Sequence, residues 1–243
     1  MWPDVIALRN FYSSRLGHIA RQMIRGKIRE FWPNIKGKAV VAIGYSTPYL
    51  RYYRKESQRL VAFMPAEQGA LAWSKKNPNI AVLTEETQLP LPDKSIDLVL
   101  LIHSLEFTSY PREMIREVWR VLAKGGRLLI VVPNRSGLWA RVDKTPFGQG
   151  QTYSLSQLIH FMKENNFTSL RSEYALYIPP FRSKLMLSAA RAFEKIGRRW
   201  FQSFSGVLFL EVSKQVYASE TLETVAWQDK LEFVKKLVVP LKN

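Results

Sequence analysis

An apolar run that ends in a turn, over residues 39–50, constrains the fold of this 243-residue chain more than any other segment. Residues 40–43 are largely β-formers, and Gly44 follows them at the start of a cluster of turn residues. An apparent helix start comes next, so a helix is expected over 48–55. Nucleotide-type α/β folds begin with this order of strand, loop and helix, and the backbone of the loop faces a ligand. The sequence therefore predicts a strand over 39–43 and a ligand-facing loop after it.

Strand and helix patterns alternate after this unit. Further apolar runs of β type predict strands at 60–64, 80–83, 96–103 and 127–132. Helical patterns lie at 65–76 and at 111–123, where Lys124, Gly125 and Gly126 form an expected helix stop. The run 96–103 is apolar almost throughout, which is typical of a central strand covered on both faces. Strand–helix–strand repeats at this spacing predict an α/β fold with right-handed crossovers and a parallel sheet.

A stripe of apolar residues precedes the first strand. It has helical period, with arginines on the other faces, and Pro33 and Gly37 end it. Residues 1–37 are therefore predicted to form a long amphipathic helix, with Gly17 and Gly26 as points where it could break. Such a helix could pack on the domain as a lid or flank, or lie on a membrane. Its apolar face consists of Leu8, Tyr12, Leu16, Ala20, Ile24, Ile28 and Trp32.

The second half of the chain begins with a long irregular loop over 134–153. Ser154 then begins a helix with a capping-box pattern. Strands are predicted at 167–178 and 206–212, with a second basic amphipathic helix at 182–201 between them. Long loops inside compact domains are usually functional, so the loop 134–153 is the candidate region for substrate contacts.

The charge of the chain is unevenly distributed. The 36 Lys and Arg residues exceed the 20 Asp and Glu residues, which gives a net charge of +16. The excess lies in residues 1–60 and 181–201, on either side of a nearly balanced middle. Two basic segments favour anionic partners such as nucleic acid, an acidic membrane surface or an anionic substrate. A basic, solvated face with no such partner is the alternative.

Composition and spacing exclude several kinds of site. Without cysteine there is no disulfide framework, thiolate metal site or cysteine nucleophile. The chain has no metal-ligand spacing, no phosphate-binding P-loop and no G-x-S-x-G elbow. No apolar run approaches the ~18–20 residues that span a bilayer, and the first residues lack the layout of a secretory signal. A cytoplasmic protein without a transmembrane segment is expected.

Two adjoining motifs carry a resemblance to a known family. Residues 111–133 read PREMIREVWRVLAKGGRLLIVVP, and residues 89–93 read LPLPD shortly before Ile96 and Asp97. Both resemble class I S-adenosylmethionine-dependent methyltransferases, and more narrowly the type 11 branch, which acts mostly on small molecules. The resemblance covers residues 38–135. It implies a doubly wound, mostly parallel sheet of seven strands, with S-adenosylmethionine over the carboxyl ends of the first strands.

The resemblance also implies an activity and a single domain. A methyl group would pass from the sulfonium of S-adenosylmethionine to an unidentified, small-molecule acceptor by in-line displacement, mainly through proximity and alignment. Helix 182–201 is interpreted as an insertion before the last strand. The domain would comprise an N-terminal helix (1–37), a cofactor-binding half (38–135), a substrate-side half (136–213) and a tail (214–243).

The glycine loop departs from the family pattern. Gly44 matches the first glycine of the family's G-x-G-x-G loop, whereas Ser46 and Pro48 stand where the second and third glycines would be. Ser46 can still let the backbone come close to a ligand, but Pro48 removes one donor N–H. Ala42 occupies the position of an acid two residues before the first glycine.

The acidic cofactor contacts are only partly present. Met64 stands where a carboxylate normally takes the ribose hydroxyls, with Glu67 as a candidate replacement. Glu85 matches the acid that contacts adenine. The cofactor-binding residues that the resemblance implies are Gly44, Tyr45, Ser46, Met64, Glu67, Glu85 and Glu86.

His103, at the end of the fourth strand, is the candidate catalytic residue. In the family this edge lines the methionine end of the cofactor, and a histidine there could act as a general base. It could equally pack or form hydrogen bonds at a strand end, and the sequence identifies no acid as its partner. Within the loop 134–153, Arg135 and Arg141 would suit an anionic acceptor. The candidate substrate residues are Trp139, Arg141, Phe147 and Tyr153.

Two other functions remain open at this point. An RNA-binding or RNA-modifying protein would use the two basic helices, although no RNA-binding module or Asn-Pro-Pro-Tyr-type motif is present. A non-catalytic interaction protein on a methyltransferase scaffold would bind no cofactor.

Overall fold

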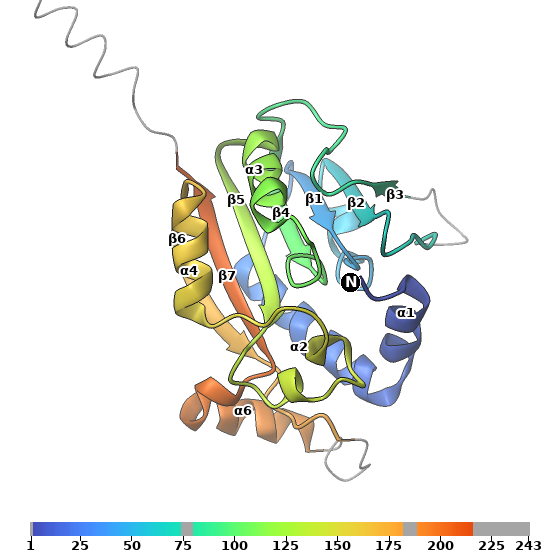
Figure 1. The fold of residues 1–243 in the computed structure, drawn as a ribbon, viewed down its shortest axis with the longest axis vertical. Helices are drawn as coiled ribbons and strands as arrows, with labels where there is room; N and C mark the ends of the chain where they lie inside the picture. Colours follow the sequence, from blue (N-terminus) through green and yellow to red (C-terminus); the bar gives the residue numbers. More distant parts are fainter. Residues whose placement is uncertain (1, 74–79, 182–188, 216–243) are drawn as a thin grey trace, which may run out of the picture.

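The protein is built on one seven-stranded sheet with the order β3-β2-β1-β4-β5-β7-β6 (Figure 1). The structure is a computed structural model that describes residues 2–73, 80–181 and 189–215. Strands β1 to β5 run parallel, and β7 is antiparallel to both of its neighbours. This confirms the mostly parallel sheet of seven strands. The strands are β1 Ala39–Ile43, β2 Arg59–Pro65, β3 Ala81–Thr84, β4 Ile96–Ile102, β5 Leu122–Pro133, β6 Phe167–Ala175 and β7 Val207–Lys214.

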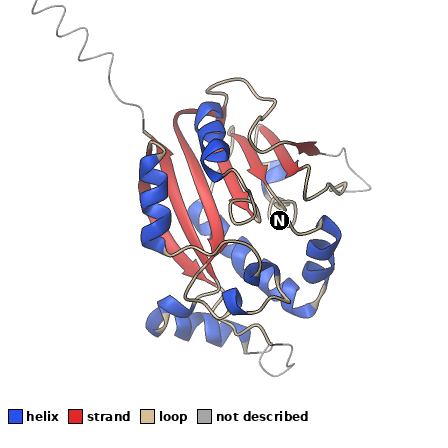
Figure 2. Cartoon of the chain, in the orientation of Figure 1, coloured by secondary structure: helices blue, strands red, loops and turns tan. Residues whose placement is uncertain are grey.

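Helices cover both faces of the sheet (Figure 2). Because side chains alternate along a strand, Val40 and Ala42 of β1 join one core cluster, while Val41 and Ile43 join the other. The first cluster includes the apolar faces of α1 and α2, and the second includes those of α3 and α4. These helices are α1 Val5–Ser13, α2 Arg15–Phe31, α3 Pro111–Val121 and α4 Leu155–Glu164.

The N-terminal amphipathic stripe forms two helices, not one. Ser14 ends α1 in an extended conformation, and its hydroxyl accepts the Gly17 N–H as the cap of α2. A Cβ on Gly17 would lie 2.0 Å from the carbonyl oxygen of Phe11, so the close approach of the two helices requires glycine there. The predicted stripe is buried along both helices, and burial of a residue such as Ile24 contributes roughly 1.5–3 kcal/mol.

The predicted helices after β1 and β2 are the main errors in the expected fold. Residues 48–55 contain only a 3₁₀ turn, Tyr53–Lys55, and the described part of 65–76 contains no helix, with 74–79 outside the described residues. Tyr49, Leu50 and Tyr53 instead bury their side chains in the cluster that contains α2. The N-terminal helices therefore provide the cover that crossover helices provide in other doubly wound sheets.

The predicted stop at Lys124–Gly126 is also wrong in detail. Helix α3 already ends at Val121, and these three residues belong to β5. Ile96 pairs with Leu122 but Leu98 pairs with Arg127, so β5 carries extra residues between these pairs. Gly125 has a φ of +74° in this irregularity, which is where a bulge favours glycine.

The end of the chain follows the prediction more closely. Helix α4 has the full capping box between Ser154 and Gln157. Helix α6, Ala190–Trp200, connects β6 with β7 and lies at the edge of the sheet where β6 ends (Figure 1). The predicted start of this helix at 182–188 and the tail from 216 onward lie outside the described residues.

Candidate functional site

Gly44 brings the first loop directly against the end of β4. Its φ is +91°, and a Cβ there would lie 2.3 Å from the carbonyl oxygen of Ile102 and 2.6 Å from that of His103. Its N–H donates to the carbonyl of Phe63 in β2 at 2.9 Å. The ends of three adjacent parallel strands therefore meet at one glycine, in the position where open α/β sheets bind ligands.

His103, the first residue after β4, adopts a left-handed backbone conformation with a φ of +52°. Such a conformation is uncommon outside glycine and is concentrated at functional sites. Its side chain is 1% exposed, at the ends of β1 and β4, which is the place where open α/β sheets have their ligand crevice. The backbone is thus held in a costly state at the residue that the sequence predicts to be catalytic.

A chain of buried polar side chains passes through the imidazole of His103. Glu106 places Oε1 3.4 Å from Nδ1, and its Oε2 accepts the N–H of Ser104 at 3.0 Å. On the other side, the hydroxyl of Tyr12 lies 2.5 Å from Nε2 and accepts a hydrogen bond from Tyr49 at 2.6 Å. Because Tyr12 accepts from Tyr49, its own proton is donated to Nε2, and the imidazole proton then lies on Nδ1, facing Glu106.

Glu106 is the acid that sequence analysis failed to assign to His103. The two residues are three positions apart on the tight turn after β4, a spacing that was visible in the sequence. Both are buried, and the carboxylate lies 3.4 Å from the imidazole Nδ1, near enough to act on the imidazole electrostatically.

Tyr12 and Tyr49, the two tyrosines hydrogen-bonded in series with His103, are neutral groups at neutral pH. Burial is the main cause that raises the pKa of Tyr12 well above its ordinary value, and the neighbouring Tyr49 raises it further. Burial also raises the pKa of Tyr49. Tyr12 therefore acts as a neutral phenol that covers Nε2 of His103.

Helix α1 lies beside the carboxyl ends of β1, β2 and β4 and forms a roof over the loops that follow them (Figure 1). The backbone N–H of Val5 donates to the carbonyl of Gln68 at 2.9 Å, which ties the start of α1 to the loop after β2. Trp2 lies against Phe107, and the ring of Tyr12 stacks on Tyr45 with centroids 5.8 Å apart. The first helix thus covers the loops that follow β1, β2 and β4.

Three polar atoms beneath this roof have no hydrogen-bond partner among the described residues. They are Ser46 Oγ, Gln68 Oε1 and His103 Nδ1, the last because its 3.4 Å contact with Glu106 lacks hydrogen-bond geometry. Gln68 was missed by sequence analysis, although it directly follows Glu67. Its Nε2 donates to the carbonyl of His103 at 3.1 Å. Buried polar groups are rarely left unpaired, so Ser46 Oγ and Gln68 Oε1 fit a site that takes a polar ligand.

Residues 32–130 match the family described as a methyltransferase domain. This part of the chain belongs to that family. It is a class I domain of the type 11 branch, as the motifs at 89–93 and 111–133 predicted.

Similar proteins agree with this assignment. The demethylmenaquinone methyltransferase of Chlamydia trachomatis is 35% identical over 86 residues, which cover 34% of this chain and 37% of that protein. A methyltransferase from Archaeoglobus fulgidus has a TM-score of 0.60 at 15% identity, covering 80% of this chain and 94% of that one. A possible histamine N-methyltransferase from Thermotoga maritima has a TM-score of 0.55 at 17% identity, covering 87% and 92%. The chain spans half or less of the curated relatives it matches, and the structural likenesses concern the fold alone.

The expected cofactor residues of the methyltransferase domain divide into two groups. Gly44, Tyr45, Ser46 and Met64 are buried at the ends of β1 and β2 beneath α1. The three acids are not part of this buried group. Glu67 and Glu85 are exposed, and Glu86 accepts a hydrogen bond from Thr108 at 2.9 Å. After β2 it is Gln68, not Glu67, that turns inward.

The expected substrate residues also separate. Trp139 and Phe147 are buried beside the crevice, with the Phe147 ring 5.2 Å from the His103 ring and 5.3 Å from Trp139. Tyr153 belongs to the core on the opposite face of the sheet, where burial raises its pKa to about 12. Arg141 is exposed. Two aromatic residues of the loop 134–153 therefore reach the site, and the structure does not bring Arg141 or Tyr153 to them.

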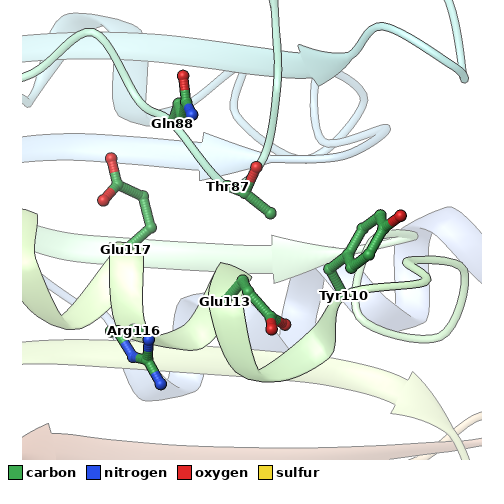
Figure 3. A pocket seen from close by; sticks show the side chains of 6 residues that line it. All are labelled: Thr87, Gln88, Tyr110, Glu113, Arg116 and Glu117. Carbon is green, nitrogen blue, oxygen red and sulfur yellow. The ribbon is translucent and has the colours of Figure 1, made fainter.

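A separate polar groove of about 380 Å³ lies between α3 and the loop before β4 (Figure 3). Its lining shares no residue with the crevice. The side chains come from the loop, from the residue before α3 and from α3 itself: Thr87, Gln88, Tyr110, Glu113, Arg116 and Glu117.

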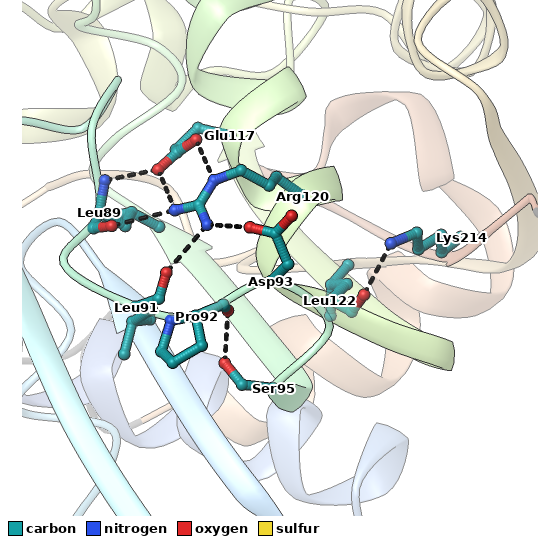
Figure 4. Close-up of polar contacts among 9 residues, drawn as sticks. All are labelled: Leu89, Leu91, Pro92, Asp93, Ser95, Glu117, Arg120, Leu122 and Lys214. Atoms are coloured by element: carbon teal, nitrogen blue, oxygen red, sulfur yellow. Dashed lines mark hydrogen bonds and ion pairs between the residues drawn. The ribbon is translucent and has the colours of Figure 1, made fainter.

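The motif at 89–93 is held against α3 by two charged residues (Figure 4). Arg120 donates to the carbonyls of Leu89 and Leu91 at 3.0 and 2.9 Å, and it also binds Asp93 and Glu117. Glu117 in turn accepts the N–H of Leu89 at 2.7 Å. Arg120 and Glu117 therefore clamp the motif to α3, just before the chain enters β4.

Replacing Arg120 with methionine should lower the free energy of unfolding by about 1–2 kcal/mol. The substitution leaves two carbonyls and two carboxylates without their donor, and partial exposure of Arg120 reduces the cost. Urea denaturation measures the change. Arg116→Met, at an exposed position of the same helix, is the matched control and should change it by less than about 0.5 kcal/mol.

The same variant should alter sensitivity to acid. The hydrogen bond from Arg120 is the main cause that lowers the pKa of Glu117 in the folded state. A lowered folded pKa contributes stability that is present above the unfolded carboxyl value, about 4.3, and is lost as pH falls through the folded value. As the pH falls from 5 through the folded pKa of Glu117, the free energy of unfolding should therefore decrease less in Arg120→Met than in the wild type. Equal acid profiles would contradict this role for Arg120.

Among the described residues, no helix is long and apolar enough to cross a membrane. No group of three or more His, Asp or Glu residues in the described ranges could hold a metal ion.

Proposed function

We propose that this protein transfers a methyl group from S-adenosylmethionine to a small, planar, largely apolar acceptor. The observation that carries the proposal is the pair of unpartnered buried atoms Ser46 Oγ and Gln68 Oε1, which lie with Gly44 and His103 at the carboxyl ends of β1, β2 and β4. S-adenosylmethionine would supply a methyl group on a good leaving group. The chain would then act mainly by holding two ligands in line.

The cofactor would be held by a modified set of contacts. The backbone from Gly44 to Ser46 can approach a ligand closely, and the Gln68 amide offers a neutral partner for hydroxyl groups near the place where the family has a carboxylate. Glu85 is carried over as the adenine contact. Each missing charge-assisted hydrogen bond costs roughly 1.5–3 kcal/mol, or about ten- to a hundredfold in affinity. Binding weaker than that of family members with all three acids is therefore expected.

The acceptor would bind on the aromatic side of the crevice. Phe11 of α1 lies against both Trp139 and Phe147, with ring centroids 6.4 and 6.1 Å apart. Such a wall suits the flat face of an apolar molecule. The similarity to a demethylmenaquinone methyltransferase supports an acceptor of this kind. The exposed arginines that suggested an anionic acceptor, Arg135 and Arg141, do not line this wall.

His103 would act as a general base when the acceptor carries a proton, with Glu106 orienting the imidazole through Nδ1. Its Nε2 is hydrogen-bonded to the hydroxyl of Tyr12 in α1. Helix α1 must therefore move before Nε2 can accept a proton from an acceptor.

Titration calorimetry with S-adenosylmethionine and S-adenosylhomocysteine tests the proposal. Saturable binding of both, weakened about tenfold by Gln68→Ala, is the expected result. The exposed Gln88→Ala is the matched control and should leave the affinity unchanged. Absence of any heat or thermal shift at millimolar ligand would contradict the proposal and leave a non-catalytic scaffold. Salt-dependent binding of RNA in place of the cofactor would favour the RNA-binding alternative.

Once an acceptor that needs deprotonation is found, His103→Gln should lower kcat by about 10²- to 10⁴-fold with little change in cofactor affinity. Glu106→Gln should have a smaller effect, because it keeps the imidazole in place but removes the charge that favours its protonated form. Single-turnover kinetics with saturating cofactor measure both. Unchanged rates for His103→Gln would restrict His103 to a structural role.

A further inference from the structure

Helix α6 is attached to the domain by its inner face. The Glu194 carboxylate accepts the backbone N–H groups of Leu176 and Tyr177 at 3.0 and 2.9 Å. A Cβ on Gly197 would lie 2.4 Å from the side chain of Tyr177, so the helix sits directly on the residues after β6. Glu194, the sole acid of α6, is therefore turned inward, and these contacts fix the orientation of the helix on the domain.

The other side of α6 and the residues after it present a mixed apolar and basic surface. We call this surface the α6 face. Its large apolar side chains are more than half exposed, and Trp200 is 71% exposed. Three cations of α6 are also exposed: Arg199 lies over the ring of Trp200 at 5.6 Å, and Lys195 and Arg198 line a groove shared with α2. The α6 face consists of Ile196, Trp200, Phe201, Phe204, Lys195, Arg198 and Arg199.

We propose that the α6 face binds the surface of an anionic phospholipid bilayer. Exposed apolar side chains of this size mark interaction sites, and an amphipathic helix with aromatic residues beside cations suits the boundary between headgroups and acyl chains. The cations complement acidic headgroups, and the net charge of +16 draws the chain to such a surface. The aliphatic Ile196 suits acyl chains better than it suits stacking on nucleic-acid bases.

The α6 face also lies next to the aromatic side of the crevice. The Asn134 amide donates to the carbonyls of Ser203 and Ser205, at 2.9 and 3.1 Å. A Cβ on Gly206 would lie 2.5 Å from the ring of Trp139. The segment after α6 is thus packed against the loop 134–153. Docking on a bilayer would hold the acceptor side of the domain close to the membrane, a consequence that rests on the proposed function, whereas the binding itself does not.

Flotation of the full chain with lipid vesicles tests the proposal in the absence of S-adenosylmethionine. The protein should float with vesicles of phosphatidylcholine mixed with phosphatidylglycerol and not with phosphatidylcholine alone. The triple variant Trp200→Ala, Phe201→Ala, Phe204→Ala should lower the partition coefficient more than tenfold. Arg198→Gln with Arg199→Gln should lower it by about fivefold for each cation and reduce its dependence on salt.

Matched changes on a distant exposed surface provide the control. Tyr110→Ala with Arg116→Gln removes one exposed aromatic ring and one cation near α3 and should leave partitioning unchanged. Thermal melting of every variant establishes that the fold is retained.

Several results would overturn the proposal. Equal flotation of the α6-face variants and the control, or no flotation of the wild type, would do so. Equal binding to neutral and anionic vesicles would exclude recognition of acidic headgroups. Binding of RNA but not of vesicles, lost in the triple variant, would assign the α6 face to nucleic acid. Flotation that appears only after removal of residues 216–243 would mean that this segment is the natural occupant. Because cofactor is absent from the assay, failure of the methyltransferase proposal would leave the expected result unchanged.

Discussion

Replacing Gly44 with alanine should lower the free energy of unfolding by at least about 3 kcal/mol and abolish detectable binding of S-adenosylmethionine. The added methyl group would lie 2.3 Å from the carbonyl oxygen of Ile102, and that oxygen belongs to the backbone of the central strand β4. The φ of +91° strains any residue with a Cβ in addition to this clash. The first loop would have to move away from His103, and the crevice would lose its shape.

Two other glycines separate the contributions to this effect. Gly37 also has a positive φ, +76°, but a Cβ there meets nothing within 4 Å, so Gly37→Ala should cost only about 1–2 kcal/mol through strain. Gly26 lies inside α2 with open space around it, and Gly26→Ala should stabilise the protein by about 0.5–1 kcal/mol. Urea denaturation of the three variants gives the order. A Gly44→Ala variant that is no less stable than Gly37→Ala would show that β1 and β4 do not approach each other as described.

The fold was predictable where residue type alone decides the structure. The five parallel strands are apolar runs of the right length. The apolar run 96–103 predicted a central strand covered on both faces, and Ile96–Ile102 is buried almost throughout. The capping box at Ser154 fixed the start of α4. In each case a local pattern and its tertiary surroundings agree.

The errors arise where tertiary packing overrides local preference. An apparent helix start after the first loop predicted a helix over 48–55, but α2 already occupies the face of the sheet on which that helix would pack. Tyr49, Leu50 and Tyr53 are buried from an irregular backbone instead. A local helix signal cannot show which element already covers that face of the sheet.

The place of the candidate site in the sheet follows from the topology, whereas most of the side chains around it do not. Gly44 and His103 follow strands that are adjacent in the sheet, so their proximity follows from topology. The contributions of Tyr12 and Gln68 could not be predicted in the same way. Tyr12 is one of several apolar-stripe residues with the same helical spacing, such as Leu8 and Leu16. Only the close approach of α1 to the end of β4 shows that Tyr12 is the one that contacts His103. Gln68 differs from Glu67 only in which of two adjacent loop side chains turns inward.

Removing the hydroxyl of Tyr12 should change stability and cofactor affinity in opposite directions. Tyr12→Phe keeps the ring but leaves His103 Nε2 and the Tyr49 hydroxyl without their partner in a buried place, which costs the closed state about 1–3 kcal/mol. If α1 must move before the ligand binds, this cost is absent from the bound state. The affinity for S-adenosylmethionine should then rise by about tenfold while the free energy of unfolding falls.

Tyr53→Phe is the matched control for this variant. The hydroxyl of Tyr53 donates to the carbonyl of Trp32, away from His103, and burial raises its pKa to about 12. Its removal should reduce stability without changing affinity. Calorimetry gives the affinities, urea denaturation gives the stabilities, and hydrogen exchange of the α1 amides should become faster when ligand is added to the wild type. Parallel losses of stability and affinity in Tyr12→Phe would instead make its hydroxyl a contact to the ligand. Helix α1 would then be a permanent wall of the site, because a roof that leaves on binding cannot also contribute a contact to the bound state.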